Sequence, residues 1–84
     1  MPMQTDLKPL LTKTQMTGII IKEYNRLIDH AKEELKLSPG SFQIKYHYHA
    51  LINELTLIAM DLGLITKAEK ERYEMEAVED LQRV

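Results

Sequence analysis

A regular row of apolar residues runs through the second half of the chain. Its steps alternate between four and three residues, which predicts one continuous stripe along a helix. Ile52 and Ala59 widen the stripe, whereas Leu57 and Met60 lie on another side of the same helix. One neighbour cannot cover a helix that is apolar in several directions, so we predict that the stripe is an interface inside a bundle or between subunits. Its six residues are Ile44, Tyr48, Leu51, Leu55, Ile58 and Leu62.

The start of this helix has a second interpretation. Residues 42–50 alternate between apolar and polar side chains, a pattern typical of a half-buried strand. We favour the helix because the same residues extend the stripe, and because no turn signal separates them from Leu51. The helix is therefore expected to begin at Ser41 or Phe42 and to end at Leu62.

An earlier helix is predicted to begin near Thr12 or Thr14. Either hydroxyl can accept a hydrogen bond from the free N–H groups of a first helical turn. Apolar residues then recur at three- and four-residue spacing, with charged residues on the other side. The isoleucine run at 19–21 leaves a strand as the competing interpretation there. Pro39 disfavours helical geometry at the preceding residue, so the segment 37–40 is expected to end the helix.

The third predicted helix carries the fewest apolar residues. Gly63 supplies a C-cap for the helix before it, and Thr66 with Glu69 has the spacing of a capping box. Oppositely charged side chains four residues apart support this helix, which is expected to end near Gln82. Because its apolar face is thin, we expect this helix to fray or to serve as an appendage. We expect removal of residues 68–84 to be tolerated better than any cut inside residues 44–62.

These elements predict an all-α fold, a small helical bundle of about three helices. Two long helices should pair in antiparallel fashion, with a shorter, charged helix at the C-terminal end. Residues 1–13, which contain two prolines, are predicted to form an N-terminal arm. Residues 14–84 are predicted to form a single helical domain.

The size of the chain favours self-association. A chain of 84 residues buries only about 60–65% of its unfolded surface, so its core is marginal. Small proteins add disulfides, metals or partner subunits, and the absence of cysteine excludes disulfides and cysteine zinc sites. We therefore expect a homo-oligomer.

Charge changes this picture modestly. The net charge is −2, but residues 1–50 carry seven Lys/Arg and five Asp/Glu, and residues 51–84 carry four and eight. This asymmetry favours head-to-tail or antiparallel contact between chains, and it is too small to indicate a nucleic-acid-binding face. No secretory signal and no unbroken apolar stretch of 18 residues is found, so we expect a cytoplasmic protein without a membrane span.

The tetrapeptide 46–49, Tyr-His-Tyr-His, is the most distinctive candidate site. On a strand the two histidines would share a face and could bind a metal, whereas on a helix they lie about 200° apart. Since a helix is favoured, we expect no metal here. Exposed aromatic rings beside basic groups are typical of surfaces that stack on a ring or meet a phosphate. The candidate ligand-binding residues are Arg26, Lys45, Tyr46 and His49.

The other candidate metal-binding and catalytic residues give weaker evidence for a site. His30 with Glu33 and Glu34 has the spacing of two metal ligands, but zinc requires at least three and no third is evident. There is no cysteine nucleophile, no glycine-rich phosphate loop and no nucleophile elbow. We therefore expect no catalytic residues, no bound cofactor and no metal.

Two functions follow as hypotheses. The first is a small non-enzymatic protein, a regulator, inhibitor or assembly factor, that acts by protein–protein binding and self-association. The alternative is an oligomer that sequesters an anionic nucleotide-like molecule or a short nucleic acid at a subunit interface. The junction at residues 62–66 resembles a helix-to-helix turn of many small bacterial and phage proteins, but a likeness of five residues implies no function.

Overall fold

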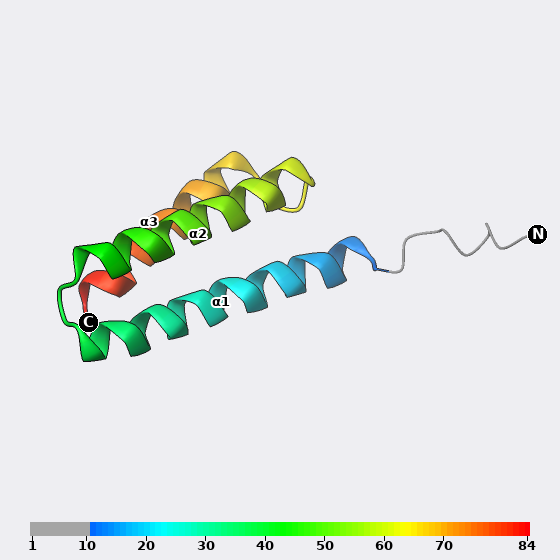
Figure 1. Cartoon of the computed structure of the whole chain (residues 1–84). Helices are drawn as coiled ribbons and strands as arrows, with labels where there is room; N and C mark the ends of the chain where they lie inside the picture. Colours follow the sequence, from blue (N-terminus) through cyan, green and yellow to red (C-terminus); the bar gives the residue numbers. More distant parts are fainter. Residues whose placement is uncertain (1–10) are drawn as a thin grey trace, which may run out of the picture.

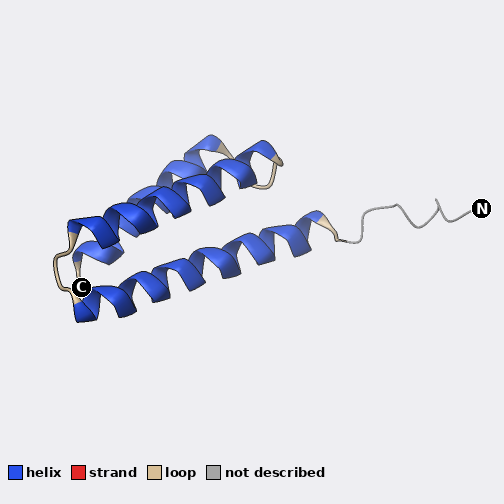
Figure 2. Ribbon diagram, viewed as in Figure 1, coloured by secondary structure: helices blue, strands red, loops and turns tan. Residues whose placement is uncertain are grey.

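The computed structural model describes residues 11–84 and contains three helices. They are α1 (Lys13–Leu37), α2 (Phe42–Asp61) and α3 (Lys67–Gln82), as Figure 1 shows. Within the described residues there is no strand (Figure 2), so the all-α prediction is confirmed. The strand interpretations of residues 19–21 and 42–50 are excluded. Most of the predicted arm, residues 1–13, lies outside the described part of the chain.

The helices follow one another up, down and up. α1 and α2 run in opposite directions as the predicted pair, and α3 folds back along α2 (Figure 1). The C-terminal end of the chain thereby lies beside the turn that joins α1 to α2. Within residues 11–84, no helix is both long enough and apolar enough to cross a membrane.

The helix ends are specified locally. Thr12 caps α1 through a capping box with Gln15, and Thr66 caps α3 through the predicted box with Glu69. The Ser41 hydroxyl accepts from the Ile44 amide at the start of α2. Gly63 adopts φ +76° at the end of α2, a conformation that glycine tolerates best.

A Schellman motif completes that turn. The Gly63 amide donates to the Met60 carbonyl, and the Leu64 amide donates to the Ala59 carbonyl, both over 2.9 Å. The chain reverses there in few residues, so α3 returns along α2. This geometry explains why the predicted C-cap is correct.

All three helices contribute to the main core. The turn between α2 and α3 adds a second, smaller cluster, in which Met16 and Ile20 of α1 cover Ala59, Leu64 and Ile65. The buried residues of the main core are Tyr24, Leu27, Ile28, Ala31, Leu35, Tyr48, Ile52, Ala77 and Leu81.

The expectation that the third helix is an appendage is wrong. Leu81 is fully buried and Ala77 nearly so, and both belong to the main core. The Tyr24 hydroxyl also donates to the Tyr73 carbonyl over 3.1 Å, which ties α1 to α3. A thin apolar face therefore suffices, because small and well-placed residues occupy it.

Candidate functional site

In the folded chain, part of the predicted apolar stripe of α2 is buried in the core and part is exposed. Its core-facing row is Tyr48, Ile52, Thr56 and Ala59, which is rotated away from the predicted stripe. Of the six stripe residues only Tyr48 is buried. Ile44 and Leu55 are half-buried against the core, so part of the stripe serves the fold of the single chain.

The remaining stripe residues form an exposed apolar surface. Leu51, Ile58 and Leu62 are 38%, 46% and 60% exposed. Successive steps of seven and four residues place them on one side of α2. We call these three residues, together with the adjoining edges of Ile44 and Leu55, the outer face of α2.

A row of polar residues borders the outer face. His47, Glu54 and Asp61 are all exposed and follow one another at intervals of seven residues. Each interval is nearly two helical turns, so the three side chains lie along one edge. The His47 ring packs edge-on against Tyr48, with ring centroids 5.1 Å apart.

Tyr48 anchors α2 to α1. Its hydroxyl donates to the Glu34 carboxylate. That hydrogen bond, together with burial, raises the pKa of Tyr48 above its ordinary value. Arg26 lies on this side of α2, where it pairs with Glu23 of its own helix. The Arg26 guanidinium lowers the pKa of Glu23 through the same hydrogen bonds.

A groove of about 400 Å³ lies on the other side of α2, against α3. Its floor is formed by Ile52 and Ala77, and His49 lies in its wall. Burial, reinforced by the Lys45 ammonium, lowers the pKa of His49. The other residues that line the groove are Asn53, Glu71, Glu74, Met75 and Val78.

An aromatic pair stands on the surface of α2. Phe42 and Tyr46 are 76% and 66% exposed, and their rings stack with centroids 6.0 Å apart. Tyr46 is two residues from Tyr48 and therefore points about 200° away from it on the helix. Sequence reasoning did not single out Phe42, although its spacing of four from Tyr46 is the signal for such a pair.

The four candidate ligand-binding residues do not gather in one chain. Lys45 and His49 are close enough to affect each other, and Tyr46 stands on the same helix. Arg26 lies on the Tyr48 side of α2 and is already paired with Glu23. A site made of all four would require a second copy of the chain.

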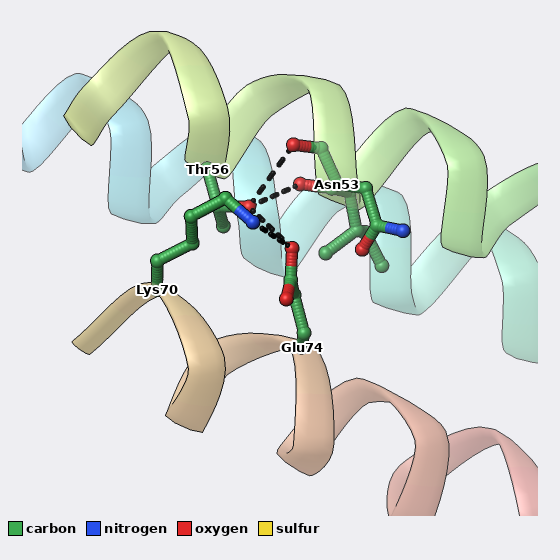
Figure 3. A network of polar contacts seen from close by, with 5 residues as sticks. Asn53, Thr56, Lys70 and Glu74 are labelled. Carbon is green, nitrogen blue, oxygen red and sulfur yellow. Dashed lines mark hydrogen bonds and ion pairs between the residues drawn. The ribbon is translucent and has the colours of Figure 1, made fainter. Parts of the chain in front are cut away.

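A polar network that sequence reasoning missed crosses from α2 to α3 (Figure 3). The buried Thr56 hydroxyl lies 3.0 Å from the Ile52 carbonyl, 3.1 Å from that of Asn53 and 3.3 Å from a Glu74 carboxylate oxygen. Lys70 donates to the same oxygen over 2.6 Å. A hydroxyl carries one hydrogen, so Thr56 donates to one of its three acceptors at a time.

This network holds α2 and α3 together. Glu74 and Lys70 are each about three-quarters or more buried as side chains, and they neutralise each other. Within residues 11–84, every buried polar side-chain atom has a hydrogen-bond partner. In the same part of the chain, no three His, Asp or Glu side chains converge as metal ligands would.

Comparison with known proteins gives no relative. No family model, no curated protein and no solved structure matches this chain.

Proposed function

We propose that this protein acts by protein–protein binding, as a small regulator, inhibitor or assembly factor that associates with itself. The observation that carries the proposal is the outer face of α2. Its three exposed residues are large and aliphatic, and a chain of this size has few other ways to enlarge its core. Covering them removes apolar surface from water, which is the main driving force of association.

The described side chains favour binding over catalysis. The two histidines of α2 lie apart, since His47 stands at the edge of the outer face and His49 in the α2–α3 groove. The buried polar groups satisfy one another through helix-to-helix contacts. No nucleophile beside a general base emerges from these contacts, whereas large apolar side chains remain in water.

Two adjacent residues provide a matched test. Ile58 is 46% exposed on the outer face, and Leu57 is 43% exposed on a different side of α2. Sedimentation velocity should show the wild type associating at micromolar concentration. Ile58→Lys should reduce association at least tenfold, while Leu57→Lys should leave it unchanged. A wild type that sediments as a 9.8 kDa monomer, or equal effects of both variants, would overturn the proposal.

The exposed aromatic pair favours a second candidate, the binding of an anionic, ring-bearing molecule such as a nucleotide. Phe42 and Tyr46 offer an exposed ring face, and the basic Lys45 precedes Tyr46 on the same helix. Calorimetric titration with ATP and a short single-stranded DNA at low salt would test it, since phosphate contacts are strongest there. Binding that Tyr46→Ala abolishes would support this candidate, and absence of heat would exclude it.

A further inference from the structure

We infer that a second copy of the chain covers the outer face, with the two α2 helices packed in antiparallel fashion about a two-fold axis near residue 53. This arrangement rests on the proposed self-association and specifies its geometry. Two observations carry it: the placement of the apolar residues along α2 and the order of the polar side chains in the row that borders them.

Two pairs of apolar residues match when α2 is reversed, whereas Ile58 falls opposite the position of the buried Tyr48. Leu51 and Leu55 each lie two residues from position 53, and Ile44 and Leu62 each lie nine residues from it. An antiparallel pair centred there places Leu51 against Leu55 of the partner subunit. It also places Leu62, the most exposed residue of the face, against Ile44 of the partner subunit. An isologous interface requires this kind of self-complementarity.

The polar border is complementary in nearly the same register: its centre is Glu54, one residue from position 53, which offsets its pairs by about 3 Å along the helix. His47 and Asp61 lie seven residues to either side of Glu54. In an antiparallel pair related by a two-fold axis, the same edge of each helix meets its copy. His47, a hydrogen-bond donor, therefore lies opposite Asp61 of the partner subunit, and the contact occurs twice. Glu54 meets its own copy near the axis, which is the one like-charge contact.

The alternative packings lack the match between His47 and Asp61. An antiparallel register shifted by seven residues pairs Leu51 with Leu62 of the partner subunit and so also covers apolar surface. However, it brings Glu54 beside Asp61 of the partner subunit twice. Repulsion between these like charges would weaken the dimer. A parallel pair keeps His47 and Asp61 about 21 Å apart along the axis and aligns the two helix dipoles.

Single cysteine variants distinguish the three packings, because the natural chain has no cysteine. In the inferred register, position 54 lies about 3 Å along the axis from its copy, position 58 about 15 Å and position 62 about 27 Å. A disulfide needs Cα atoms within about 7 Å of each other. Under mild oxidation Glu54→Cys should form a covalent dimer, and Ile58→Cys and Leu62→Cys should not.

Other disulfide patterns would show whether the register or the self-association itself is wrong. A disulfide at position 58 but not at 62 would assign the shifted register, and disulfides at both 58 and 62 would assign the parallel pair. Either result would overturn the inference while leaving self-association intact. A wild type that remains monomeric in sedimentation would instead overturn the proposed function.

The like-charge contact gives a second test without cysteine. Glu54→Gln removes the repulsion at the axis and should tighten the dimer by roughly two- to fivefold. Asp61→Asn removes the carboxylate charge opposite His47, although its amide oxygen can still accept a hydrogen bond, and should weaken the dimer by a similar factor. Weakening by Glu54→Gln, or no change from either variant, would contradict the register.

Discussion

Tyr48 and Tyr46 lie two residues apart on α2 in opposite environments. Tyr48 is buried and donates to Glu34, whereas Tyr46 is largely exposed and touches Phe42. Tyr48→Ala should cost about 3 kcal/mol or more of unfolding free energy, as truncation of a core aromatic residue does. Tyr46→Ala should change it by less than about 0.5 kcal/mol. Urea unfolding followed by circular dichroism measures both, and equal losses would contradict the helical placement of these residues.

The Tyr24 hydroxyl predicts a pH-dependent contribution to stability. Burial, helped by the Glu76 and Asp80 carboxylates, raises the pKa of Tyr24 to about 12, above the ordinary value of 10.0. The neutral phenol therefore contributes stability that is complete below pH 10 and is lost as the pH rises from 10 through about 12.

Tyr24→Phe isolates that contribution, because phenylalanine cannot ionise. At pH 7 the variant should be about 1 kcal/mol less stable, since its ring no longer donates to the Tyr73 carbonyl. Above pH 10 the difference in unfolding free energy between the two proteins should narrow. Only the wild type has a phenol at this position, and that phenol ionises more readily in the unfolded chain, which favours unfolding. Urea unfolding at pH 7 and at alkaline pH measures this difference, and a difference that stays constant would contradict the assignment.

At the scale of the helices, two glycines should respond to alanine with opposite signs. Gly63 holds φ +76° in the Schellman turn, and alanine there should cost about 1–2 kcal/mol. Gly18 lies exposed inside α1, where an added Cβ would meet no neighbour within 4 Å. Gly18→Ala should therefore stabilise the protein by about 0.5–1 kcal/mol. Thermal melts of the two variants should move in opposite directions from wild type.

α3 is tested by a buried and an exposed residue of the same helix. Leu81 is fully buried in the main core, and Met75 is 64% exposed. Leu81→Ala should cost about 2–5 kcal/mol, and Met75→Ala should be close to neutral. Chemical unfolding of both variants measures this difference. A small effect of Leu81→Ala would restore the interpretation of α3 as an appendage.

The helices were more predictable than their packing. Caps are local, so Gly63 and Thr66 could be identified from their immediate neighbours, and the first cap could be narrowed to Thr12 or Thr14, of which Thr12 is the cap. The burial of Leu81 could not, because it depends on α3 folding back onto Tyr24 and the rest of the core. The number of apolar residues in a helix indicates the width of its apolar face. Whether each of those residues is buried depends on which neighbouring helix its side chain points toward.

For the candidate site, too, the sequence indicated which residues share a helix face but not which of them are covered by another helix. Periodicity identified the stripe on α2 but could not say which part α1 would cover. The structure takes Tyr48 into the core and leaves Leu62 in water, and it separates Arg26 from Tyr46. Thr56 is a single polar residue between Leu55 and Leu57 in the sequence, and only the position of Glu74 on α3 makes it part of a network.

At the scale of the whole molecule, α2 lies between two helices and still exposes apolar side chains. α1 covers its Tyr48 side, and α3 covers the side of Thr56. The outer face remains exposed. A second copy would supply the covering that a third neighbouring helix supplies in larger bundles.

Self-association of this kind makes stability depend on concentration. If the folded chain pairs through the outer face and the unfolded chain does not, dimerisation adds to stability by mass action. The midpoint of thermal unfolding should then rise as the protein concentration increases from about 1 to about 100 µM. Ile58→Lys should show a midpoint independent of concentration, while Leu57→Lys should rise with concentration as the wild type does. Equal concentration dependence in both variants would show that the chains meet through another surface, and no dependence in the wild type would show that the folded chain is monomeric.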